Sequence, residues 1–246
     1  MKKKTTLELV EQSAKVSLYS ISFLKDRTTE FELFLRKFEE EAYYNEDYQR
    51  ILYALSIILE RGALERYFRP EGKMNDDLCA LPIESGRIRL FCLRISDEVL
   101  ILGNGDIKRT AAYEDDPRLL GYSLDLQRFD KLLRKDIEGW DCDYRGKRTD
   151  QYRRQRVFDM KQNALLHKQL GQVSPAIKQE MDWSCAIIDK IYSILEHKGI
   201  SQRELAKRIG CNETQITRWT RGFPNFTLSS LAKLSEALGE PLINIS

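Results

Sequence analysis

Residues 199–239 read GISQRELAKRIGCNETQITRWTRGFPNFTLSSLAKLSEALG and carry the clearest structural pattern in the chain. Ser201 stands three residues before Glu204, which is the spacing of a capping box at the start of a helix. Gly210 is suited to end this helix, and Asn212 is suited to cap a second one. The stretch therefore predicts two short helices joined by a tight turn.

The second helix is expected from residue 213 onward. Its apolar residues are predicted to face the core, and its remaining side chains are polar. Ile216 and Trp219 are predicted to be buried. The other side chains are amides, hydroxyls and guanidinium groups, which suit base edges and phosphates in a major groove. We predict a helix-turn-helix that contacts DNA through Gln202, Asn212, Glu213, Thr214, Gln215, Thr217, Arg218 and Arg221.

Residues 210–222, GCNETQITRWTRG, resemble the recognition segment of the XRE (Cro/C1-type repressor) family. PNFT at residues 224–227 is similar to the HNFT-type tetrapeptide that follows the recognition helix in HigA-like antitoxins, with Pro224 in place of His. The resemblance implies a repressor that binds a palindromic operator as a homodimer. The alternative is that this three-helix module is only a protein–protein interaction domain.

The chain has 246 residues and a formal net charge of +2. This length suits two ordinary domains. Because the net charge is small, a nucleic-acid surface has to be a local basic patch, and Arg and Lys outnumber Glu within residues 199–239. The five cysteines include no C-x-x-C pair and there are two histidines, so we expect a reducing cytoplasm, no metal and no cofactor. No run of residues reaches transmembrane length.

The first half of the sequence has the pattern of an α+β domain. It predicts a strand at 15–24, helices at 29–42 and 47–61, and strands at 78–83, 87–95 and 99–102. This β-α-α-β-β-β order, with FRPEGKMND at 68–76, RIRLFCLR at 87–94 and LILGNGDIK at 100–108, resembles the RelE/HigB toxin superfamily over residues 15–135. The phage Gp49-like branch is the most similar.

Members of that superfamily are ribosome-dependent mRNA interferases or degenerate relatives. Cleavage of RNA through its own 2′-hydroxyl needs a proton acceptor, cations at the phosphate and a donor for the leaving oxygen. Arg87 and Arg89, two apart on one strand, are predicted to project from the same face. By resemblance the catalytic candidates are Arg69, Lys73, Arg87, Arg89 and Lys108, with Tyr113 or Tyr122 as a loose partner. Each candidate cation is alternatively an ordinary solvated charge, and Asp106 stands where the family often has Gly.

Residues 141–160 are charged and poor in aliphatic side chains, which predicts a linker between domains at 1–140 and 161–246. A basic arm that reaches nucleic acid is the alternative. After it, Leu165, Leu166 and Leu170 form an apolar stripe that either docks on the first half or makes a local contact. The second half is expected to be all-α.

We therefore expect a fused toxin–antitoxin protein, natural or engineered, whose HigA-like half neutralises a RelE/HigB-like mRNA interferase and binds operator DNA. One alternative is a transcriptional regulator whose RelE-like domain is an inactive scaffold or an effector sensor. Another is an mRNA interferase with a regulatory tail. The expected partners are operator DNA, mRNA on the ribosome and a second copy of the chain, with no membrane.

Overall fold

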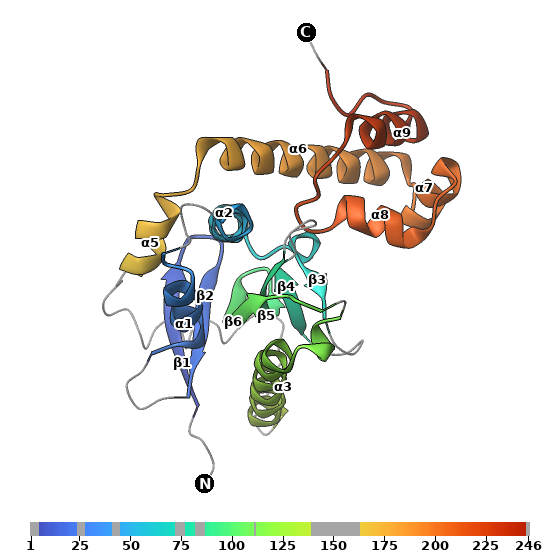
Figure 1. The fold of residues 1–246 in the computed structure, drawn as a ribbon. Coiled ribbons are helices and arrows are strands. Elements are labelled where there is room, and N and C mark those ends of the chain that lie inside the picture. The colour runs from blue at the N-terminus through green and yellow to red at the C-terminus, as the bar shows by residue number, and fades with distance from the viewer. Residues whose placement is uncertain are drawn as a thin grey trace.

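A central β-sheet covered by helices forms the first half of the molecule, and a group of helices forms the second half (Figure 1). The computed structural model describes residues 5–23, 28–40, 45–71, 77–81, 87–110, 112–138 and 163–244. The predicted combination of an α+β half and a helical half is confirmed. Lys73 and the predicted linker at 141–160 lie outside the described residues.

The sheet has six strands in the order β1-β2-β6-β5-β4-β3. Its strands are β1 Thr6–Gln12, β2 Ser17–Ser22, β3 Arg69–Pro70, β4 Leu78–Leu81, β5 Ile88–Ser96 and β6 Val99–Ile107. Neighbouring strands are antiparallel except β2 and β6, which run parallel. The long connection from β2 to the remaining strands makes this parallel pairing possible, because parallel neighbours need a crossover.

The predicted strand order β-α-α-β-β-β lacks two strands that the structure contains. β1 forms the edge beside β2, and its carboxylates Glu8 and Glu11 interrupt the apolar pattern that marks a strand. Charges of this kind are common on edge strands, which face solvent. β3 pairs only Arg69 and Pro70 with β4, so it is too short to leave a pattern in the sequence.

Helices cover both faces of the sheet. Helix α1, Glu30–Lys37, and helix α2, Glu46–Arg61, pack on one face, where Phe34 contacts the ring of Tyr48 at 5.7 Å between centroids. Helix α3, Pro117–Glu138, packs on the other face through Leu119 and Leu126. Because both faces are covered, most side chains of β5 and β6 are buried.

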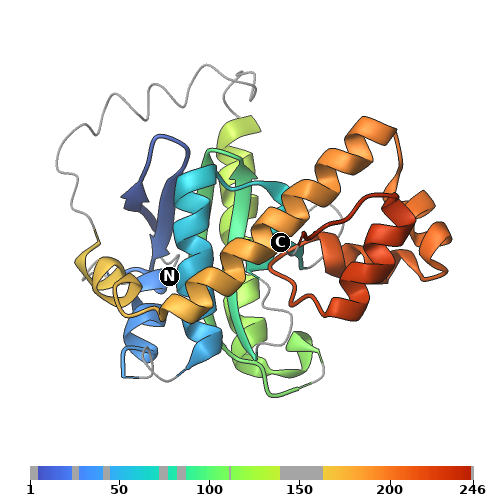
Figure 2. The ribbon, with the colours of Figure 1, turned by 90° about the horizontal axis from the view of Figure 1, so that it is seen from above.

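The second half contains five helices among the described residues. They are α5 Ala164–Leu170, α6 Pro175–Lys198, α7 Gln202–Ile209, α8 Glu213–Thr220 and α9 Leu228–Leu238. Figure 2 shows α6 crossing over α2 on its way from α5 to α7. Beyond this crossing, Ile191, Leu205, Ile216 and Leu234 form a separate core that holds α7, α8 and α9 to the end of α6.

The apolar stripe before α6 docks on the first half. Leu166 is fully buried in the same core as α1 and α2. Val173, just before α6, and Ile177, Met181 and Cys185 on α6 continue this contact. The buried amide of Gln169 completes the contact: its oxygen accepts a hydrogen bond from the Tyr48 hydroxyl, and its nitrogen donates to the Leu35 carbonyl at 3.2 Å. The two halves therefore share one hydrophobic core.

Polar pairs line the edge of that core between α2 and α6. They are Arg50 with Glu180 at 3.0 Å, Tyr53 with Asp182 at 2.9 Å and Arg61 with Asp189 at 3.0 Å. Since successive pairs advance along both helices, they fix how far α6 is shifted along α2. Among the described helices, none is long and apolar enough to cross a membrane.

Candidate nucleic-acid interface

Helices α7 and α8 are joined by the tight turn that the sequence predicts. The Ser201 hydroxyl accepts a hydrogen bond from the Glu204 amide at 3.1 Å, and the Asn212 carboxamide accepts one from the Gln215 amide at 2.8 Å. Between them Gly210 ends α7 in the left-handed conformation with φ 73°. The carboxylate of Glu204 does not complete the capping box but lies 3.3 Å from Arg208. The predicted starts of both helices and the predicted end of the first are confirmed.

The underside of α8 packs on the core of the helical half. Ile216 is fully buried, as predicted, and Thr220 is buried one turn later. Trp219 is only half-buried at the edge of this core, so its predicted burial is only partly correct. These contacts decide which face of α8 points into the protein and leave the opposite face to solvent.

The solvent face of α8 carries Thr214, Thr217 and Arg218, all exposed. Residues three and four apart lie side by side on a helix, so these side chains form one continuous polar strip. Gln215 borders the strip and is half-buried, while Asn212 is exposed at the start of the helix. Hydroxyl, amide and guanidinium groups on a short protruding helix suit the base edges of a major groove.

Three of the predicted DNA-contacting side chains also have polar partners within the protein. Gln202 donates from its amide nitrogen to the hydroxyls of Tyr192 and Thr220, both at 3.3 Å. Glu213 lies 3.6 Å from Arg203. Arg221 was expected to face outward, but its guanidinium pairs with a carboxylate of the first half, Glu65, at 2.9 Å. Tyr192, Arg203 and Glu65 lie outside the recognition helix, so spacing within that helix could not predict these contacts.

Residues 191–243 match the helix-turn-helix family model. The match starts within α6 and covers α7, α8 and α9, which together form the helix-turn-helix domain. The remainder of the chain lies outside this match. Comparison with curated proteins gives no match, and comparison with solved structures gives none either.

The helix-turn-helix domain has several exposed cations. These are Arg203, Lys207, Arg208, Arg218 and Lys233. Since the whole chain has a net charge of only +2, this concentration is a local property of the domain. A local excess of Arg and Lys attracts the phosphates of a nucleic acid without requiring a basic protein.

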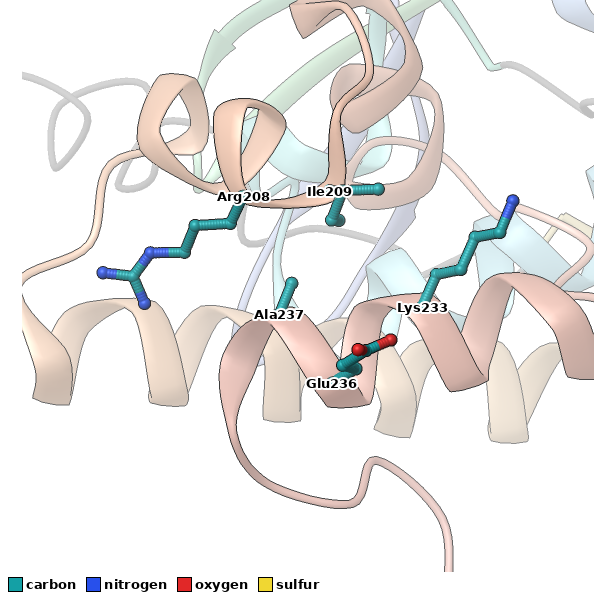
Figure 3. A pocket seen from close by; sticks show the side chains of 5 residues that line it. All are labelled: Arg208, Ile209, Lys233, Glu236 and Ala237. Atoms are coloured by element: carbon teal, nitrogen blue, oxygen red, sulfur yellow. The ribbon is translucent and has the colours of Figure 1, made fainter.

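A groove of about 590 Å³ lies between α7 and α9. Ile209 and Ala237 face each other across it, with Arg208 and Lys233 at its two ends and Glu236 beside Ala237 (Figure 3). Its lining is mixed in polarity and carries charges of both signs. Because the groove belongs to the helix-turn-helix domain, it lends no support to an effector pocket in the α+β half.

The candidate catalytic cations of the α+β half differ in their surroundings. Arg69 is exposed on β3, with Nε 3.8 Å from Glu71 Oε1. Arg89 is only 8% exposed, and burial lowers the pKa of its guanidinium. Burial raises the pKa of Glu71, although Arg69, Arg89 and Lys108 act in the opposite direction. Three of the predicted cations therefore surround one carboxylate.

Arg87 and Arg89 differ in exposure and in their position relative to strand β5. β5 begins at Ile88, so Arg87 precedes the strand; it is exposed, and its amide donates to Asp47 at 2.8 Å. The backbones of β5 and β6 also approach closely here. A Cβ atom at Gly105 would lie 1.8 Å from the Arg89 carbonyl oxygen, so glycine is required at that position.

Asp106 lies beside this close approach but is neutralised within the protein. Its carboxylate is buried, 3.3 Å from Lys37 Nζ and 3.4 Å from the Arg118 guanidinium. Lys37 also contacts the hydroxyl of Tyr122 at 3.1 Å, and Tyr113 packs edge-on against Phe91 in another part of the core. Sequence reasoning missed Lys37, because a lysine at the end of an amphipathic helix has the pattern of a solvated charge.

Proposed function

We propose that this protein is a sequence-specific regulator that binds operator DNA with α8. The exposed polar strip of Thr214, Thr217 and Arg218 carries the proposal, because it is the part of the helix-turn-helix domain that its own core leaves open. Thr214 and Gln215 are the base-reading side chains in this proposal. Asn212 and Arg218 hold the helix on the duplex through its capped start and its charge.

The proposed binding unit is a homodimer on a palindromic operator. Repressors of this type place two recognition helices in successive major grooves, with half-sites about 10 bp apart from centre to centre. A chain with one copy of α8 reads one half-site, so two copies are needed for a site of operator length. The promoter of the protein's own gene is the most direct target for such a regulator.

The α+β half is proposed to serve as a scaffold docked on the regulator. It shares a core with α5 and α6, and the ion pairs between α2 and α6 hold the two halves in one arrangement. In the toxin–antitoxin interpretation, a HigA-like half inhibits a RelE/HigB-like half through the same contacts. Tethering would then keep the two halves bound to each other, since linked partners meet at an effective concentration of about 1 mM.

Selection from random-sequence duplexes tests the proposal with the full-length protein. We expect enrichment of a two-fold symmetric motif whose half-sites are about one helical turn apart. The variant Arg218→Ala should bind the selected motif more weakly, while Ser193→Ala, an exposed change on α6, should bind like the wild type. A protein that enriches no motif is not an operator-binding regulator of this kind.

RNA cleavage in the α+β half is the second candidate function. It is favoured by the grouping of Arg69, Arg89 and Lys108 around Glu71, because this group supplies two of the three requirements of the cleavage, namely cations for the phosphate and a carboxylate as proton acceptor. Full-length protein incubated with translating ribosomes should then shorten mRNA. The exposed change Arg69→Ala should slow this cleavage without altering the fold. Intact mRNA in the presence of wild-type protein would exclude RNA cleavage by the full-length protein with its two halves in contact.

A further inference from the structure

Arg221 is the C-cap residue of α8, and its guanidinium is held by the α+β half. It directly follows the last turn of the helix, so it lies next to the end of the polar strip that the proposed function assigns to DNA. Its Nη2 atom lies 2.9 Å from Glu65 Oε1. Glu65 belongs to the short 3-10 helix η1, Glu65–Tyr67, which leads into β3.

The chain around this ion pair is fixed on both sides. The Gly222 amide donates to the Arg66 carbonyl at 2.6 Å, so the segment after α8 lies directly against η1. The ring of Phe223 stacks on the ring of Tyr67 with centroids 5.5 Å apart. Figure 1 shows the end of α8 lying next to the β3 edge of the sheet. Glu65 is thus placed at the end of the DNA-reading strip by the backbone and not by its own ion pair alone.

The exposure of the two partners is unequal. Glu65 is 67% exposed and Arg221 is 29% exposed. A carboxylate in this position presents to Arg221 the same chemistry as a DNA phosphate, namely oxygen acceptors with negative charge. It also repels any phosphate that approaches the end of α8. Because the Glu65 carboxylate is solvent-exposed, the strength of the pair is modest, and a phosphate is able to compete for the guanidinium.

We propose that Glu65 is part of the DNA interface, as an intramolecular competitor that occupies the phosphate-binding guanidinium of Arg221 in the free protein. This inference rests on the proposed function. It assigns to the α+β half a direct effect on DNA affinity: DNA binding has to replace the Glu65 carboxylate with a phosphate. An ordinary ion pair between the halves, without any role in DNA binding, is the interpretation that the experiment has to separate from it.

Removal of the competitor should strengthen DNA binding. Glu65→Ala is expected to raise the affinity for the selected operator and for unrelated duplexes alike by about two- to five-fold, the range that one exposed ion pair supplies. The dependence of affinity on salt should steepen, because in the wild type salt also weakens the competing Glu65–Arg221 pair and so partly offsets the weakening of the DNA contacts. Glu65→Gln should act in the same direction, since it removes the charge and keeps the size. Fluorescence anisotropy of labelled duplexes over a salt series measures both quantities.

Two comparisons distinguish competition from a general loosening of the halves. In an Arg221→Ala background, Glu65→Ala should no longer raise the affinity, because the guanidinium for which it competes is absent. Glu39→Ala removes another exposed ion pair between the halves, with Lys168 at 2.9 Å, and should leave DNA binding unchanged. If Glu65→Ala leaves the affinity and the salt slope unchanged, or acts equally in the Arg221→Ala background, the inference is wrong. Failure of the wild type to bind any operator would instead contradict the proposed function.

Discussion

Replacement of Phe223 by Ala is expected to lower the free energy of unfolding by about 3–5 kcal/mol. Phe223 follows the recognition helix in the chain, yet it is 7% exposed and belongs to the core formed by α1, α2 and the sheet. Its ring stacks on Tyr67. The substitution removes this contact and leaves a cavity at the interface between the two halves, so both halves are destabilised.

Urea unfolding followed by circular dichroism measures this effect. We expect the transition midpoint to move to lower urea in Phe223→Ala, since the core that spans the halves is weakened. Trp183→Ala is the matched control, because Trp183 is an aromatic residue on α6 that is 64% exposed. Its loss should change the stability by less than about 0.5 kcal/mol. An unchanged midpoint in Phe223→Ala would mean that the two halves are stable independently of each other.

The helix-turn-helix could be predicted from the sequence because its determinants are local. Ser201, Gly210 and Asn212 each act within a few residues of their own position, on a helix end or a turn. The alternation of apolar and polar residues then decides which face of α8 is buried. None of these steps depends on a partner far away in the chain, so the structure reproduces the predicted boundaries.

The docking of the halves could not be predicted in the same way. Gln169 is buried between Tyr48 and Leu35, which are more than a hundred residues away, and Phe223 stacks on Tyr67 across a similar distance in the chain. Local periodicity contains no information about such contacts. It predicts that an apolar stripe is buried, but not which element covers it.

The same limit applies to charged side chains in the candidate sites. The sequence shows which residues carry charge, whereas burial and pairing decide what they do. Asp106 is paired with Lys37 and Arg118, and Arg221 is paired with Glu65. The alternation of side chains along β5 predicts on which face of the sheet Arg89 lies. It does not predict whether Arg89 is exposed there, because helices cover both faces of the sheet. Charged residues therefore needed the tertiary structure before their roles could be proposed.

Substitution of Gln215 or Thr214 by Ala is expected to relax the base preference of the selected operator. A carboxamide that pairs with both acceptor and donor of an adenine, or a threonine methyl that contacts thymine, gives about 1–3 kcal/mol of discrimination at its base pair. Neither side chain is required to cap α8, since Asn212 makes that contact. The loss should therefore appear as a smaller difference between the operator and its single-base variants, with the helix retained.

Competition binding with a panel of operators, each changed at one base pair, measures this difference for every position. Lys207→Ala is the informative comparison, because Lys207 is exposed on α7 and its charge acts on phosphates of any sequence. It should weaken all duplexes by a similar factor, whereas Gln215→Ala and Thr214→Ala should each alter one or two positions. If both α8 variants keep the complete base preference of the wild type, α8 is not the element that reads the operator. The half-buried position of Gln215 makes it the more demanding test, because its side chain has to turn outward to reach a base.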